Sequence, residues 1–264
     1  MKHLEISPIE RFFLISRPFN NIHILVLLIS FSIFAQKSIT NQNLIWYAYY
    51  NNLIFNEQWV LTNEIQERHF INPTAQHHWL IRANLQRNLG YNWSVFIGMA
   101  YFLQSPQNPE DKSSLIVPEL RPYIGCNNKQ KLPFGVISQR YKIEARFFHD
   151  VENDKLAGGY RFSNYRIRYQ LGFQFPVIRK KKTKKDLFSI KIQNELFFNI
   201  GRKIVKNIFD QNRIYIGINY KINTRFSFEI GYMNWFQQRA SGIDFYNRDI
   251  IRFSLFHTIF LKNK

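Results

Sequence analysis

Charged side chains recur at every second position in two neighbouring stretches of the chain. Arg140, Glu144 and Arg146 share this spacing in the first stretch, and Arg166 and Arg168 share it in the second. Successive side chains of a β-strand point to opposite faces, so this spacing places the charges on one face of each strand. A guanidinium pairs with a carboxylate through two parallel hydrogen bonds. The expected chemistry of this face is therefore ion pairing or the binding of an anion.

The polar faces of the other predicted strands extend this charged set. If the strands close into a barrel, all of these side chains point into one enclosed lumen, which is wet and charged. The predicted lumen set is Glu64, Arg68, Arg82, Glu119, Arg121, Arg140, Lys142, Glu144, Arg146, Arg166, Arg168, Glu195, Arg213, Glu229 and Arg252.

Two interpretations of the lumen set remain open. In the first, the charges form an ion-pair network that fills and stiffens a narrow barrel; in the second, they form an anion-selective pore or a site for an acidic solute. We favour the network, because a barrel of 10–12 strands leaves little free space inside. Arginines outnumber glutamates in the set, however, so some positive charge should remain uncompensated.

The histidines are the other candidates for chemistry. His77 and His78 are adjacent, His149 precedes an aspartate, and His257 precedes a threonine, but none lies in a recognisable nucleophile motif. His69, His77 and His78 also lack the spacing of metal ligands. We therefore predict no catalytic residue, no metal site and no cofactor. A membrane-embedded hydrolase acting on lipid or envelope glycolipid is kept as the alternative function.

The elements that must position the charged set are strands. Eleven stretches alternate polar and apolar residues, and the apolar face is long and aromatic, with Tyr141, Ile143, Ile167 and Tyr169 in the two central strands. Lipid outside and water inside satisfy both faces of such strands. The predicted strands are residues 43–52, 58–70, 78–89, 93–103, 115–126, 136–147, 165–175, 188–200, 213–221, 226–232 and 251–260.

The predicted fold is all-β: a single antiparallel up-and-down transmembrane β-barrel. Bacterial barrels usually have an even number of strands, so we expect about 12 strands, with 10 as the next choice. The longer linkers mostly follow even-numbered strands, which is the asymmetry of short turns and long loops in outer-membrane barrels. The strands hold five tryptophans near their predicted ends, and we expect these to anchor in the membrane interface: Trp46, Trp59, Trp79, Trp93 and Trp235.

Composition agrees with a barrel and limits the other classes. The net charge is +18, aromatic residues make up 17% of the chain, and the mean hydropathy is −0.30, which argues against a helical membrane protein. The single cysteine, Cys126, excludes an intrachain disulfide and a cysteine-cluster metal site.

The densest basic run is residues 179–185, and it could bind acidic lipid head groups or phosphate. We favour a solvated turn for this run. Nucleic acid is not an expected partner, because a secreted barrel strand is predicted on each side of the run.

The first 35 residues predict a secretory signal peptide. Basic residues precede a short apolar run at 24–34, and a small residue, Ala35, ends it. We expect cleavage after Ala35, so that residues 1–35 form the signal peptide and residues 36–264 form the barrel. A membrane anchor is the alternative, but the apolar run is shorter than the roughly 20 residues that a spanning helix needs.

Several short patterns resemble a known family. They are Trp59–Glu64 with Gln66 and Arg68, Pro118–Tyr123, Gln139–Phe147, Arg166–Tyr169, Gln211–Arg213 and Glu229–Met233. Over residues 43–261 the chain is similar to the uncharacterised bacterial outer-membrane barrels grouped as domain of unknown function 2490. The resemblance implies a membrane barrel secreted to the outer membrane. It implies no settled activity and therefore no catalytic residues.

Together these observations predict an integral barrel of the cell outer membrane, of the Gram-negative type. Its expected role is structural, or the binding or transport of a small anionic solute, and we do not expect an enzyme. Outer-membrane lipid and small anions are the expected partners, while the oligomeric state stays open. A soluble periplasmic lipid-binding barrel is disfavoured, because its solvent face would hold few lysines and many arginines paired with glutamates.

Overall fold

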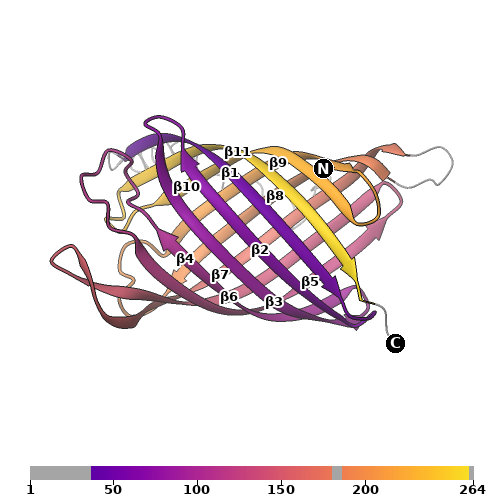
Figure 1. Cartoon of the computed structure of the whole chain (residues 1–264), viewed down its shortest axis with the longest axis horizontal. Coiled ribbons are helices and arrows are strands. Elements are labelled where there is room, and N and C mark those ends of the chain that lie inside the picture. Colours follow the sequence, from indigo (N-terminus) through magenta and orange to yellow (C-terminus); the bar gives the residue numbers. More distant parts are fainter. Residues whose placement is uncertain (1–36, 180–185, 262–264) are drawn as a thin grey trace, which may run out of the picture. The chain divides into compact units, whose positions relative to one another are not determined.

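The computed structural model of the protein describes residues 37–179 and 186–261 (Figure 1). The predicted signal peptide lies outside the described residues. Within these ranges no helix is long and apolar enough to cross a membrane. Eleven strands form one sheet: β1 (Ser38–Ile54), β2 (Trp59–Phe70), β3 (Ala75–Gly90), β4 (Trp93–Gln104), β5 (Val117–Leu132), β6 (Gly135–Glu152), β7 (Lys155–Arg179), β8 (Asp186–Ile200), β9 (Phe209–Lys221), β10 (Phe226–Gln238) and β11 (Asp244–Phe260).

The sheet closes on itself, which confirms the prediction of an all-β barrel. Each strand pairs antiparallel with the next along the chain, and β1 pairs with β11 to complete the circle. Closure removes the two free sheet edges, whose backbone N–H and C=O groups would otherwise be unpaired.

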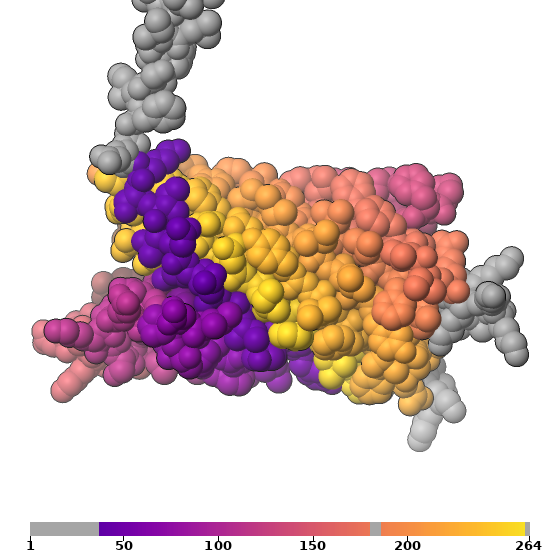
Figure 2. All heavy atoms as spheres, turned by 90° about the horizontal axis from the view of Figure 1, so that it is seen from above, coloured from indigo at the N-terminus to yellow at the C-terminus, as the bar shows by residue number. Residues whose placement is uncertain are grey.

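The predicted number of 12 strands is wrong, and so is the prediction that all strands pair antiparallel. The described part of the chain forms a barrel of 11 strands, and β1 and β11 run parallel along their full length, from Ser38↔Asp244 to Ile54↔Phe260. A closed barrel of consecutively antiparallel strands has an even number of strands only if its first and last strands also pair antiparallel. Here these two strands pair parallel, so the number is odd. Figure 2 shows β1 in indigo lying alongside β11 in yellow on the outer wall.

The two ends of the barrel differ in their connections. At one end, here called the short-turn end, residues 55–58, 91–92, 133–134 and 222–225 join neighbouring strands. At the other, the long-loop end, the connections are residues 71–74, 105–116, 153–154, 201–208 and 239–243. Two connections at the long-loop end are no longer than those at the short-turn end. One is residues 71–74. The other is the tight turn at Asn153 and Asp154, which both have positive φ and end a hairpin of β6 and β7 that projects beyond the wall (Figure 1).

The strands alternate between an exposed apolar outer face and a buried polar inner face. Tyr141, Ile143 and Ile167 are 41%, 47% and 38% exposed, whereas their neighbours Glu144 and Arg168 are 1% and 5% exposed. The outer wall is therefore apolar, and the guanidinium and carboxylate groups meet in the middle of the barrel.

The lumen also contains apolar clusters, which the charge pattern did not predict. One cluster is formed by Leu44, Trp46, Phe70, Tyr215, Met233, Trp235 and Ile250, and a second by Leu80, Phe96, Ala100, Phe102 and Tyr123. Two of the five tryptophans predicted to anchor in the membrane interface thus lie inside the barrel. That expectation is wrong for Trp46 and Trp235, because aromatic residues occupy both faces of those strands and alternation alone does not say which face is inner.

Candidate functional site

The best-connected carboxylate of the lumen belongs to Glu144 on β6. Its Oε1 lies 2.8 Å from Nη1 of Arg168 and 3.2 Å from Nζ of Lys142, and its Oε2 lies 2.9 Å from Nη2 of Arg166. All four side chains are buried. Lys142↔Arg168 and Glu144↔Arg166 are also cross-strand partners of β6 and β7, so the sheet register itself brings them together.

Two further carboxylates extend this network around the wall. Oε1 of Glu195 on β8 lies 2.7 Å from Nη2 of Arg168 and 2.9 Å from Nη2 of Arg140. Oδ2 of Asp210 on β9 lies 2.8 Å from Nη1 of Arg166. Asp210 was not in the predicted lumen set, because it fell in a stretch that looked like a loop.

Three further carboxylates, those of Glu119, Glu64 and Glu229, form four more ion pairs. Glu119, which has no exposed surface, accepts hydrogen bonds from Arg121 at 2.5 Å and from Arg146 at 2.6 Å, and also contacts the amide of Gln104. Elsewhere Arg82 lies 2.8 Å from Glu64, and Lys191 lies 3.6 Å from Glu229. The hydroxyl of Tyr215 donates to Glu229 at 2.8 Å.

Four lumen arginines in the described part of the chain have no carboxylate within ion-pairing distance: Arg68, Arg213, Arg248 and Arg252. They donate instead to neutral acceptors, such as the side-chain oxygens of Gln66, Gln211 and Tyr50. They also lie over aromatic rings, which attract cations through their negative faces. Arg68 lies 4.0 Å from the ring centre of Trp46, and Arg248 lies 4.4 Å from that of Trp235.

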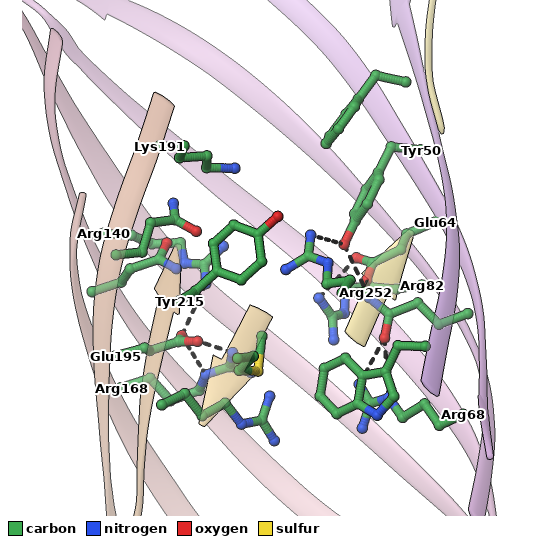
Figure 3. Close-up of a pocket in the computed structure, with 17 residues that line it drawn as sticks. Tyr50, Glu64, Arg68, Arg82, Arg140, Arg168, Lys191, Glu195, Tyr215 and Arg252 are labelled. Atoms are coloured by element: carbon green, nitrogen blue, oxygen red, sulfur yellow. Dashed lines mark hydrogen bonds and ion pairs between the residues drawn. The ribbon is translucent and has the colours of Figure 1, made fainter. Parts of the chain in front are cut away.

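A chamber of about 170 Å³ lies where three of these unpaired arginines meet the ion-pair network (Figure 3). Arg140, Arg168 and Glu195 form one wall in the figure, and Glu64 and Arg82 form the opposite wall. Two carboxylates, those of Glu64 and Glu195, line it. The cations that line it are Arg68, Arg82, Arg140, Arg168, Lys191, Arg213 and Arg252.

The chamber continues toward the short-turn end. A cavity of about 470 Å³ shares Arg140, Gln170, Lys191 and Gln193 with the chamber and reaches Lys131 near the end of the barrel. A cavity of about 330 Å³ also contacts Lys191 and reaches exposed residues of that end, such as Asp186 and Lys221. The chamber therefore opens at the short-turn end through polar side chains.

Toward the long-loop end the lumen is filled. Trp46, Trp235, Leu44, Phe70 and Ile250 are each at most 3% exposed and form a dry layer beside the chamber. Beyond them, the β4–β5 connection places the side chain of Gln107 in the lumen, where it accepts a hydrogen bond from Arg248 at 3.0 Å and contacts the rings of His77 and His78 at 3.3 and 3.1 Å. The described lumen is thus blind.

Comparison with known proteins gives the family of the chain. A family model described as protein of unknown function (DUF2490) matches residues 43–247, which run from β1 into β11. The chain belongs to this family. The resemblance seen in the sequence motifs is therefore confirmed. No curated protein matches the chain. A solved structure, the NanC porin in a rhombohedral crystal form, is similar over 81% of this chain and 97% of the porin chain. The sequence identity is 11% and the TM-score is 0.43, so this similarity is too distant to support an argument.

In this DUF2490 protein all fifteen residues of the predicted lumen set point into the barrel, but they do not form one group. Seven of them do not line the chamber: Glu119, Arg121, Lys142, Glu144, Arg146, Arg166 and Glu229. Of these, Glu229 lines the adjoining cavity of about 330 Å³. The other eight line the chamber, including Arg168, which also pairs with Glu144. Lys191, Asp210 and Arg248 belong to the same interior and were not in the set. The alternation of Phe188–Ile200 did place Lys191 on the polar face, so that signal was present in the sequence.

The histidines do not form a catalytic or metal-binding arrangement in the described residues. His77 and His78 both point inward, because β3 contains a bulge there that skips His77 in the pairing with β2, and their rings stack at 3.7 Å. His69 lies on the outer face near Glu67, and Nδ1 of His257 lies 2.9 Å from the hydroxyl of Tyr49. No histidine in residues 37–179 and 186–261 bonds a serine or threonine hydroxyl, and no three potential metal ligands meet there.

Proposed function

We propose that the protein is an integral outer-membrane barrel that binds a small anionic solute in its lumen, which the solute enters from the short-turn end. The apolar outer wall and the closed backbone pairing suit a hydrocarbon environment, in which every backbone polar group must find a partner within the protein. In outer-membrane barrels the short turns face the periplasm. The chamber would then open to the periplasm.

The excess of cations in the chamber is the observation that carries this proposal. Seven cationic side chains line the chamber against two carboxylates, and both carboxylates are already paired with arginines of the same chamber. Charges removed from water are costly unless they are compensated. An anion in the chamber compensates them, whereas a purely structural network would place carboxylates there, as it does around Arg166.

The charged residues at the mouth of the lumen also favour an anionic solute. Lys129, Lys131, Lys221 and Arg225 are exposed at the short-turn end, where Glu57 and Asp186 are the acidic residues of the described chain. A cleft lined by one sign of charge raises the local concentration of the opposite ion and speeds its association. Anions should therefore be drawn toward the chamber and cations repelled.

The filled half of the lumen favours binding over free diffusion. The dry layer around Trp46 and Trp235 leaves no open path between the two ends of the described barrel. In planar bilayers the protein should show no steady open-channel current. A stable conductance with anion or cation preference would mean that the lumen is open and that the protein is a pore.

Two measurements test the proposal. The mature protein should stay in the membrane fraction through a high-salt wash and require detergent for release; release without detergent would refute membrane integration. The purified protein in detergent should bind sulfate or succinate, added as sodium salts, in isothermal titration calorimetry, with spermidine as the cationic control. Binding of spermidine in preference to both anions, or binding of none of the three, would refute the anion site.

A further inference from the structure

Two arginines share one aromatic ring at the inner end of the chamber. The guanidinium carbon of Arg68 lies 4.0 Å from the ring centre of Trp46, and that of Arg213 lies 5.5 Å from it. Neither arginine has a carboxylate within ion-pairing distance among the described residues. Two like charges are thus held close together over a buried ring, since Arg68 is 4% and Trp46 is 2% exposed.

Hydrogen-bond donors at this place lack acceptors. Nε of Arg213 and the indole Nε1 of Trp46 are buried and make no hydrogen bond with the protein, and the same is true of Nε of Arg82 and of Arg140 on the facing walls. Buried donors in proteins nearly always have a partner. Arginine and tryptophan side chains donate but do not accept, so further packing of these groups against one another does not satisfy them.

The acceptors that Arg68, Arg213 and Arg82 contact are already used. Oε1 of Gln66 accepts two hydrogen bonds from Arg68, at 2.7 and 3.1 Å, and Oε1 of Gln211 accepts one from Arg213 at 3.1 Å. The carboxylate of Glu64 is shared by Arg82 and the amide of Gln66. Water or an anion that enters the chamber supplies the acceptor atoms that these donors lack.

We infer that Arg68, Arg213 and the indole of Trp46 form a subsite for a small oxyanion that carries at least two negative charges. This inference rests on the proposed function and names the class of its ligand. A dianion compensates both guanidiniums and offers several oxygen acceptors, whereas a monoanion leaves one guanidinium uncompensated. Dicarboxylates and tetrahedral oxyanions share this chemistry.

The size of the chamber limits the ligand. Its volume of about 170 Å³ is close to that of an engineered cavity of about 150 Å³ known to bind benzene. The ligand is therefore small, with roughly ten non-hydrogen atoms or fewer by that comparison. Tyr215 and Met233 also line the chamber, so the carbon skeleton of a dicarboxylate would meet apolar surface beside the arginines.

Matched ligands of different charge test the inference on the purified full chain. Sulfate is compared with methanesulfonate, and succinate with succinamate, by isothermal titration calorimetry at fixed ionic strength. One dianion of the two pairs should bind at least about tenfold more tightly than its monoanion, as expected for one additional charge-assisted interaction. The pair that shows the difference tells whether the ligand is tetrahedral or a dicarboxylate.

Variants then locate the site. Arg68→Gln and Arg213→Gln should each weaken dianion binding by at least about tenfold, and Trp46→Phe, which keeps a ring but removes the indole N–H, by about tenfold. Arg87→Gln is the matched control, because Arg87 is an exposed arginine of the outer wall. Heat-dependent mobility in electrophoresis reports whether each variant is folded, and Arg68→Lys and Arg213→Lys keep the charge if a glutamine variant fails to fold.

The outcomes separate the two proposals. If anions bind but the glutamine variants bind as the wild type does, or if monoanions bind as tightly as dianions, the subsite is wrong and the proposed function stands. If no anion binds, both are wrong. Loss of binding in Arg87→Gln to the same extent would also overturn the subsite, because the effect would then follow net charge and not position.

Discussion

Replacing Glu144 by glutamine should destabilise the barrel. Glu144 is 1% exposed and holds Lys142, Arg166 and Arg168 within 3.2 Å. Glutamine has nearly the same shape, so the change removes the charge and leaves the packing in place. The three cations, all buried, then lose a shared counter-ion.

The expected magnitude follows from the partners that remain. Removing one member of a buried ion pair costs about 3–5 kcal/mol, because the other charge is left uncompensated. Arg166 keeps Asp210 at 2.8 Å and Arg168 keeps Glu195 at 2.7 Å, so Lys142 alone loses its only carboxylate partner among the described residues. We therefore expect a loss near the lower end of the range, about 3 kcal/mol, which is about a hundredfold in the folding equilibrium constant.

Unfolding in guanidinium, followed by tryptophan fluorescence of the protein in lipid vesicles, measures this loss. Glu67→Gln is the matched control: Glu67 lies on the outer face, 3.4 Å from His69, and its loss should change the unfolding free energy by less than about 1 kcal/mol. A loss below about 1 kcal/mol for Glu144→Gln as well would show that the network does not stabilise the barrel. The division of the lumen into a stabilising network and a binding chamber would then be wrong.

Three further predictions concern the chamber, the packing and the orientation. Arg213→Met should raise the thermal midpoint in anion-free buffer, because it removes an uncompensated buried charge, and should abolish the stabilisation of the wild type by saturating sulfate; a lower midpoint in both buffers would contradict this. Gly217→Val should cost about 1–3 kcal/mol in guanidinium unfolding, since a Cβ there would clash with the ring of a lumen tyrosine; an unchanged midpoint would argue against that packing. In a Cys126→Ser background, a membrane-impermeant maleimide added to intact cells should label Ser241→Cys at the long-loop end and spare Thr224→Cys at the short-turn end, and the reverse pattern would invert the proposed opening.

The barrel could be predicted from the sequence because the period of two is a local property. In the strands around Tyr141, Glu144 and Ile167, one face is apolar and the other charged, and a closed barrel accommodates both. The number of strands, in contrast, depends on a pairing that is not local in sequence. Ten of the pairings join strands that are consecutive in sequence, whereas the pairing of β1 with β11 joins strands at opposite ends of the chain. No turn connects β1 to β11, so no local sequence signal shows whether they run parallel.

Other features were missed where the pattern is ambiguous or interrupted. Trp46 and Tyr47 are adjacent aromatic residues, so alternation alone does not show that Trp46 is the inner one. The bulge at His77 turns two successive histidines inward, against the period of two. Gln107 enters the lumen from a connection between strands, and its position depends on partners in β1, β3 and β11 that only the folded barrel brings together.

The distribution of charge inside the barrel distinguishes side chains that stabilise the fold from side chains that are available to bind an anion. The sequence shows that arginines outnumber glutamates, but not where the excess lies. In the structure the buried charges around Glu144 and Glu119 are matched by carboxylates. Three of the four unmatched arginines, Arg68, Arg213 and Arg252, line the chamber, which opens toward solvent. The fourth, Arg248, lies in the filled half, where it donates to the side-chain oxygens of Gln42, Gln237 and Gln107. If the excess served only to stiffen the barrel, it would be spread evenly through both halves. Its concentration in the accessible chamber is what a binding site for an anion requires.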